Sequence, residues 1–142
     1  ESVKILSSKN HYITDRNLLE INYGRAEGLD VRDLNIFFPN IIKKWSEKKD
    51  PKFPGGESYK DVGVRLNKFL KKIINKKISN CCVITHNVFL RVLVGQTFNI
   101  PKEKWFNLYI PHLMRIEFII LGNKIYPNIE RENLKIIFSK LK

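Results

Sequence analysis

The sequence of 142 residues has few cysteines, few arginines and no long apolar run. No stretch approaches the roughly 18 apolar residues that a membrane-spanning helix needs, so we expect no membrane partner. The two cysteines, Cys81 and Cys82, are adjacent. Neighbouring side chains on a strand point to opposite faces, so these two are not expected to pair. Two buried thiols, and the lack of any Asn-x-Ser/Thr sequence, predict a reducing, cytoplasmic compartment.

Positive charge exceeds negative charge by twelve, with 26 Lys and Arg against 14 Asp and Glu. Such an excess is typical of nucleic-acid-binding proteins. However, nineteen of these cations are lysines, and Lys, Asn and Ile together supply more than a third of the chain. Arginine, which forks onto phosphates and guanine edges, occurs only seven times. We therefore interpret the lysines as solvated helix faces and expect no nucleic-acid partner.

The length fits a single domain, residues 1–142, whose second half shows most clearly how it is built. Ser58 is a suitable N-cap for a helix along which apolar residues recur at helical spacing as far as Ile74. The run Cys81–Thr85 predicts a strand buried on both faces. Val88–Phe98 is apolar nearly all round and predicts a buried helix. This succession of helix, strand and helix indicates an α/β fold.

Weaker patterns cover the first half and the end of the chain. Asp33–Lys48 predicts two helices divided at Pro39, since proline suits the first turn of a helix. Near the end, a Gly-Asn pair predicts the turn of a β-hairpin with strands at Met114–Leu121 and Lys124–Tyr126. The tail from Glu130 fits a helix or a strand equally well.

His86 follows the predicted strand directly and precedes the predicted buried helix. In α/β sheets, ligands bind beyond the carboxyl ends of the strands. The backbone amides of Asn87 and Val88 belong to the amino end of the helix, where anions bind. Phosphoryl transfer is catalysed mainly by fixed positive donors aimed at the transferring group. The sequence therefore predicts a phosphate site around His86.

Three segments carry a family resemblance, in the order in which the family has them. They are Leu19–Gly24 with Glu27-Gly28-Leu29, then Pro54–Ser58 with Asp61 and Arg65, then Val83–His86 with Arg91. They resemble the acid-bearing segment, the Pro-Gly-Gly-Glu-Ser element and the second catalytic histidine of the histidine phosphatase superfamily. The resemblance covers roughly residues 15–121. It implies a phosphoglycerate-mutase-like α/β fold, a three-layer sandwich with a mostly parallel sheet and helices on both faces.

The resemblance also implies a two-step reaction through a phosphohistidine. In the family, a first histidine in an Arg-His-Gly element accepts the phosphoryl group. A carboxylic acid protonates the departing alkoxide and then activates water. Glu20 matches this acid and His86 matches the second histidine, which binds the transferring group, so we predict both as catalytic. Asn87, whose backbone amide would face the phosphate, Tyr23 and Arg25 are predicted to bind substrate.

The nucleophile of that reaction is missing from this chain. No Arg-His-Gly sequence occurs, and His11 has neither an apolar strand before it nor a glycine after it. The chain opens with Glu1, and its single methionine is Met114. We therefore expect an N-terminally incomplete histidine-phosphatase-like domain, with the nucleophile on an upstream segment and this chain inactive alone.

The length between the first two motifs bears on the type of reaction. Cofactor-dependent mutases of the family carry a long insertion with paired arginines between the Glu-Gly-Leu and Gly-Glu-Ser sequences, whereas only residues 30–55 separate these two sequences here. We therefore predict a phosphomonoesterase that acts on a small phosphorylated metabolite without a cofactor. The histidines and cysteines lack metal-ligand spacing, so no metal is expected.

A phosphoglycerate mutase using 2,3-bisphosphoglycerate is one alternative, and a non-catalytic binding domain is another. A homo-oligomer is compatible with the sequence.

Overall fold

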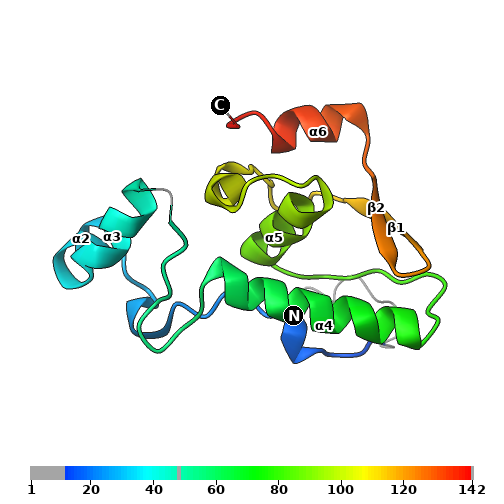
Figure 1. Ribbon diagram of the computed structural model, residues 1–142, viewed down its shortest axis with the longest axis horizontal. Coiled ribbons are helices and arrows are strands. Elements are labelled where there is room, and N and C mark those ends of the chain that lie inside the picture. Colours follow the sequence, from blue (N-terminus) through cyan, green and yellow to red (C-terminus); the bar gives the residue numbers. More distant parts are fainter. Residues whose placement is uncertain (1–11, 48, 142) are drawn as a thin grey trace.

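A computed structural model describes residues 12–47 and 49–141 of the protein. His11, which the sequence argues against as a nucleophile, lies outside the described residues. The elements in chain order are η1 (Arg16–Leu18), η2 (Gly24–Ala26), α2 (Val31–Phe37), α3 (Pro39–Ser46), α4 (Tyr59–Asn75), α5 (Asn87–Thr97), η3 (Lys102–Asn107), β1 (Glu117–Leu121), β2 (Lys124–Asn128) and α6 (Arg131–Ile137) (Figure 1).

Helix α4 begins at the N-cap that the sequence predicts. The Ser58 hydroxyl accepts a hydrogen bond from the Asp61 amide at 3.3 Å, and the Asp61 carboxylate accepts one from the Ser58 amide at 3.0 Å. This reciprocal pair is a capping box, which satisfies two amides that the first turn leaves unpaired. Val62 and Leu66 are fully buried along the face of α4 that meets α5 and η1.

Helix α5 is buried nearly all round, as its composition predicts. Phe89 is 1% exposed and Val92 is fully buried, and the helix contacts α4, η3 and β2. Gly95 allows η3 to come close, because a Cβ at this position would overlap the indole ring of Trp105. Within the described ranges, no helix combines the length and the apolar sequence that a membrane crossing requires.

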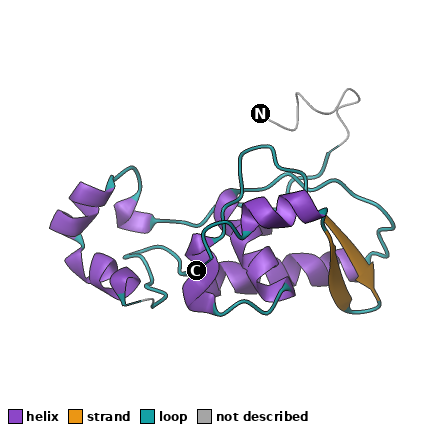
Figure 2. Ribbon diagram, turned by 90° about the horizontal axis from the view of Figure 1, so that it is seen from above, coloured by secondary structure: helices purple, strands orange, loops and turns teal. Residues whose placement is uncertain are grey.

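Helices α2 and α3 form a pair that lies to one side of α4 and α5 in both views (Figures 1 and 2). Pro39 occupies the first turn of α3, which confirms the predicted division. Phe53, which is 2% exposed, contacts Tyr23 and Trp45 edge to face, with ring centroids 4.9 and 5.5 Å apart. Phe53 therefore connects α3 to the segment that carries Tyr23.

The C-terminal part forms the expected hairpin and a final helix. Strands β1 and β2 pair antiparallel, with Ile119 opposite Tyr126. Gly122 adopts a φ of 59° in the turn, a left-handed conformation that glycine accepts without strain. The tail, which fitted a helix or a strand equally, forms α6, and its Ile137 is fully buried.

The buried strand predicted at Cys81–Thr85 is wrong. These residues have no regular structure and connect α4 to α5 (Figure 1). A strand requires a neighbouring strand with which its backbone can pair, and among the described residues the sheet consists of β1 and β2 alone. Cys81 and Cys82 are exposed, so the prediction of two buried thiols is also wrong. The described residues accordingly do not show the mostly parallel sheet of the expected sandwich.

Removing the cap of α4 should destabilise the protein. We expect Ser58→Ala to lower the free energy of unfolding by about 1 kcal/mol, the usual cost of losing an N-cap. The measurement is the midpoint of urea-induced unfolding followed by circular dichroism. Ser139→Ala is the control, because the Ser139 hydroxyl is exposed and bonds only the Ile136 carbonyl. Equal midpoints for the two variants would contradict the role of the cap.

Candidate functional site

Two segments that are distant in sequence meet at the amino end of α5. The Thr85 hydroxyl donates a hydrogen bond to the Leu18 carbonyl at 2.8 Å. The Val88 amide donates to the Glu20 carboxylate at 3.2 Å. His86 is the N-cap residue of the same helix. The fold therefore brings the predicted acid and the predicted phosphate-binding histidine to one helix end.

The Glu20 carboxylate lies against positive backbone dipoles. Its Oε1 atom accepts from its neighbour's amide, that of Ile21, at 2.9 Å and from the Val88 amide. The first turn of a helix carries partial positive charge because its amides have no partner within the helix. This end of the helix therefore attracts negatively charged groups. Glu20 is half-buried, so it remains accessible from solvent.

The His86 side chain is exposed and takes no part in capping α5. Its backbone carbonyl accepts the first hydrogen bond of the helix, from Leu90 at 3.1 Å. The imidazole can thus contact a ligand without breaking a bond of the helix. In residues 12–47 and 49–141, no three or more His, Cys, Asp or Glu side chains are grouped as metal ligands would be.

Tyr23 and Tyr59 both lie within electrostatic range of Glu20 and of Arg91. Burial, and next the charge of Glu20, raise the pKa of Tyr23 to about 12. Burial also raises the pKa of Tyr59, and the nearby Arg91 guanidinium opposes that rise. The buried Nε of Arg91 has no hydrogen-bond partner among the described residues. The positive charge of Arg91 therefore acts on the two tyrosines that also feel the charge of Glu20.

Arg91 and Tyr59 are absent from the substrate-binding residues predicted from the sequence. A signal for Arg91 existed, because it lies four residues after Asn87 and thus on the same face of a helix. Tyr59 follows the predicted N-cap directly, which places it in the first turn of α4. Its approach to Arg91 depends on how α4 packs on α5, which no local pattern encodes.

The side chains of Asn87 and Arg25 contact other parts of the protein. The Asn87 amide group donates to the Ile110 carbonyl at 2.9 Å, so this side chain holds the connection that leads to the hairpin. The Arg25 guanidinium lies 6.0 Å from the centre of the Phe38 ring, at the junction of α2 and α3. The backbone amide of Asn87 still belongs to the first turn of α5. The roles of both residues in substrate binding stay predictions.

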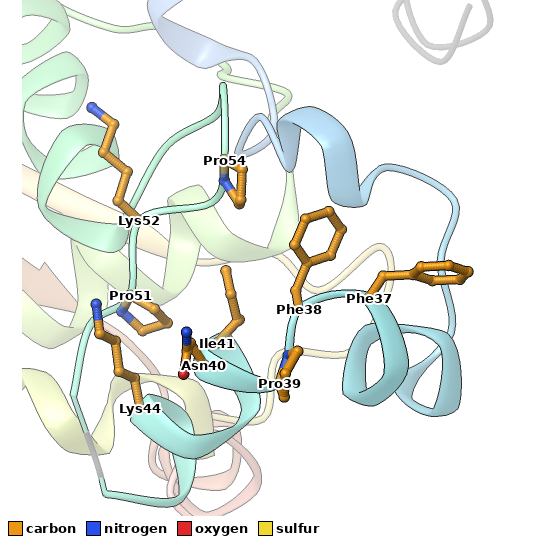
Figure 3. Close-up of a pocket in the computed structure, with 9 residues that line it drawn as sticks. All are labelled: Phe37, Phe38, Pro39, Asn40, Ile41, Lys44, Pro51, Lys52 and Pro54. Carbon is orange, nitrogen blue, oxygen red and sulfur yellow. The ribbon is translucent and has the colours of Figure 1, made fainter.

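A cavity of about 250 Å³ lies elsewhere, between α3 and residues 51–54 (Figure 3). Its walls come from Phe37, Phe38, Pro39, Asn40, Ile41, Lys44, Pro51, Lys52 and Pro54. The ammonium group of Lys52 is paired with the Asp61 carboxylate at 3.3 Å. The lining contains no histidine, carboxylate, hydroxyl or thiol side chain, so this cavity offers no nucleophile and no general acid.

Comparison with known proteins relates this chain to phosphatases of one superfamily. The profile of the histidine phosphatase superfamily (branch 1) matches residues 1–125. The chain is 27% identical over 109 residues to fructose-2,6-bisphosphatase of Saccharomyces cerevisiae, covering 75% of this chain and 24% of that protein. It is 24% identical over 109 residues to phosphoserine phosphatase 1 of Hydrogenobacter thermophilus, covering 75% and 52%. The chain thus spans about half the length or less of these curated relatives.

Tyr23 provides a test of the packing around the site. The unfolded phenol loses its proton near pH 10, whereas the folded one keeps it to about pH 12. The free energy of unfolding should therefore fall as the pH rises from about 10 to about 12, because the unfolded state then binds fewer protons. We expect Tyr23→Phe to reduce this alkaline loss, as measured by urea midpoints at several pH values.

The control for this experiment is Tyr12→Phe, because the Tyr12 side chain is 42% exposed. This variant should lose stability with rising pH as the unaltered protein does. If Tyr23→Phe also follows the unaltered protein at every pH, the buried position of the Tyr23 phenol is contradicted.

Proposed function

Because this chain belongs to the histidine phosphatase superfamily, we propose that it serves in phosphoryl transfer and that the full-length protein is a phosphomonoesterase. The reaction proceeds through a phosphohistidine. We place the histidine that becomes phosphorylated outside this chain, because no Arg-His-Gly sequence occurs in it. The substrate is a small phosphorylated metabolite, in keeping with the phosphatases among the relatives.

One observation carries this proposal: the Glu20 carboxylate and His86 share the amino end of α5. A helix amino end attracts anions through its unpaired amides and its dipole. The imidazole adds a donor for phosphoryl oxygens, and the carboxyl group adds an acid and base. These are the groups that the hydrolysis of a phosphate ester requires beside a nucleophile.

In the first step, the nucleophilic histidine attacks phosphorus and the bond to the ester oxygen breaks. His86 and the amides of the first turn of α5 bind the phosphoryl oxygens as charge shifts among them. Glu20 in its acid form gives its proton to the departing oxygen. This transfer matters most for alkoxides, which leave poorly without a proton.

In the second step, the Glu20 carboxylate takes a proton from water. The water oxygen forms a bond to phosphorus while the phosphorus–nitrogen bond breaks. Inorganic phosphate and the free nucleophilic histidine result, and Glu20 is again in its acid form. One residue thus serves as acid and then as base, and no further proton donor is needed.

Arg91, Tyr59 and Tyr23 form the part of the site that contacts the rest of the substrate. The partly exposed Arg91, whose charge acts on both tyrosines, suits a second anionic group of the substrate. A relative's name, fructose-2,6-bisphosphatase, specifies a substrate with two phosphate groups. Arg25 and the backbone amide of Asn87 contribute at the edge of this region.

We propose as well that the full-length protein has the mostly parallel sheet with helices on both faces that the family's fold implies. The matched region covers only 24% and 52% of the two relatives, so they contain further segments that could supply strands.

Replacing His86 tests the site directly. We expect the full-length protein to hydrolyse para-nitrophenyl phosphate without added metal. His86→Ala should lose about 10²-fold or more of kcat/KM, the usual cost of removing a group that stabilises the transition state. The control is His112→Ala, because His112 is exposed on a turn far along the chain. Equal activity of the two variants would remove His86 from the site, and inactivity of the unaltered protein would favour a binding domain.

Replacing Glu20 tests the acid and base. For Glu20→Gln, kcat/KM should fall about 10²–10⁴-fold with phenyl phosphate, whose phenolate leaves poorly without a proton. With para-nitrophenyl phosphate, kcat/KM should fall far less, and a burst of nitrophenolate should precede slow turnover because the water step lacks its base. Equal losses of kcat/KM for the two substrates would contradict this role.

A further inference from the structure

Arg65, on α4, engages every donor of its guanidinium group. Its Nε and Nη2 atoms donate to the two carboxylate oxygens of Glu57 at 2.7 and 2.9 Å. Its Nη1 and Nη2 atoms also donate to the backbone carbonyls of Asn17, Leu19 and Glu20, at 2.7, 3.0 and 3.3 Å. A guanidinium has five N–H groups. These five hydrogen bonds therefore use the whole group.

Glu57 holds the chain on the other side of Glu20. Its second oxygen accepts a hydrogen bond from the Asn22 amide at 2.9 Å, and its own amide donates to the Asn22 carbonyl at 2.8 Å. Arg65 thus binds the carbonyl of Glu20, while its partner binds the residue two positions later. A single ion pair fixes the backbone before and after the candidate acid.

The segment around Glu20 depends on this ion pair because it has no regular structure of its own. Backbone in a helix or a sheet is held by its own hydrogen bonds, whereas an irregular segment needs partners elsewhere. Arg65 supplies a partner for the Leu19 and Glu20 carbonyls of this segment, and for the Asn17 carbonyl in η1 just before it. A close approach of Gly56 adds a further constraint, since a Cβ there would overlap the Asn22 carbonyl.

The ion pair is largely shielded from water. The side chains of Arg65 and Glu57 are 17% and 21% exposed. Burial raises the pKa of Glu57, but the hydrogen bonds from Arg65 and from the Asn22 amide outweigh it, so the pKa lies below its ordinary value. A two-pronged pair between arginine and a carboxylate also fixes geometry more strictly than a single contact. The pair is therefore charged and formed at neutral pH.

We propose that Arg65 and Glu57 are positioning residues that hold the Glu20 carboxylate at the amino end of α5 for its work as acid and base. Neither side chain acts on the phosphate itself. This inference rests on the proposed function, and it adds that the Arg65–Glu57 ion pair sets the position of the acid.

The most direct variant is Arg65→Lys. Lysine retains the charge, but its three donors at one nitrogen cannot serve five acceptors spread over two sides of a planar group. The backbone of Glu20 should shift, and a shift of about 1 Å can reduce a rate about 10²-fold. The shifted carboxyl would serve a poor leaving group badly and would matter little to a good one.

The experiment compares kcat/KM for phenyl phosphate and para-nitrophenyl phosphate in the full-length protein. We expect Arg65→Lys to lower kcat/KM about 10²-fold with phenyl phosphate and much less with para-nitrophenyl phosphate. In a Glu20→Gln background, Arg65→Lys should add little further loss, since both changes remove the same function. If Arg65 had only a structural role, Arg65→Lys would lower kcat/KM equally for the two substrates. Its loss would then add to that of Glu20→Gln.

Lys72→Ala is the matched control. Lys72 lies on the same helix, and its ammonium group pairs with the Asp15 carboxylate at 2.7 Å. Lys72→Ala therefore removes another ion pair between α4 and the N-terminal segment. It does not contact the backbone of Glu20. This variant should keep the ratio of the two kcat/KM values, and a change like that of Arg65→Lys would overturn the inference.

A second variant keeps the inference testable if Arg65→Lys does not fold. Glu57→Gln preserves the shape of the side chain and one acceptor oxygen, but it removes the negative charge that pairs with Arg65. It should show the same selective loss with phenyl phosphate, and equal losses for both substrates would overturn the inference. Glu20→Gln distinguishes the two ideas. If it lowers kcat/KM more with phenyl phosphate than with para-nitrophenyl phosphate and the positioning variants do not, only the positioning role is contradicted. If Glu20→Gln lowers both values equally, the role of Glu20 as the acid is contradicted, and the inference with it.

Discussion

The hydrogen bond from the Val88 amide to the Glu20 carboxylate is the contact on which the candidate site depends. It brings an acidic side chain to the helix end at which His86 occupies the N-cap position. Without it, the carboxyl group and the imidazole would be two ordinary surface groups in separate segments. With it, the proposed acid and the proposed phosphate-binding histidine lie at one helix end.

That contact depends in turn on Arg65 and Glu57. The backbone around Glu20 is irregular, so its position is set by side chains rather than by a helix or a sheet. Five hydrogen bonds from one guanidinium supply that constraint from the face of α4. Since α4 also packs on α5, the helix that holds the backbone of Glu20 touches the helix that we propose as the anion site. Through α4, Glu20 and the amino end of α5 are thereby held in a fixed relative position.

Local patterns in the sequence predicted most of the helices and the hairpin. The Ser58 cap, the division at Pro39 and the buried helix after His86 follow from contacts within a few residues, which the sequence displays directly. The strand at Cys81–Thr85 failed because pairing depends on a distant partner. The environment of Arg91 escaped prediction for the same reason, as it arises from the packing of α4 on α5. The family motifs named Glu20 and His86 but could not show what holds them together.

The most direct measurement is a crystal structure of the full-length protein with vanadate, which mimics a phosphoryl group in transfer. The vanadate oxygens should contact the His86 imidazole and the first-turn amides of α5, with the Glu20 carboxyl group within hydrogen-bond distance of an apical oxygen. Vanadate bound away from that helix end, or a Glu20 carboxyl group turned away from it, would contradict the site described here.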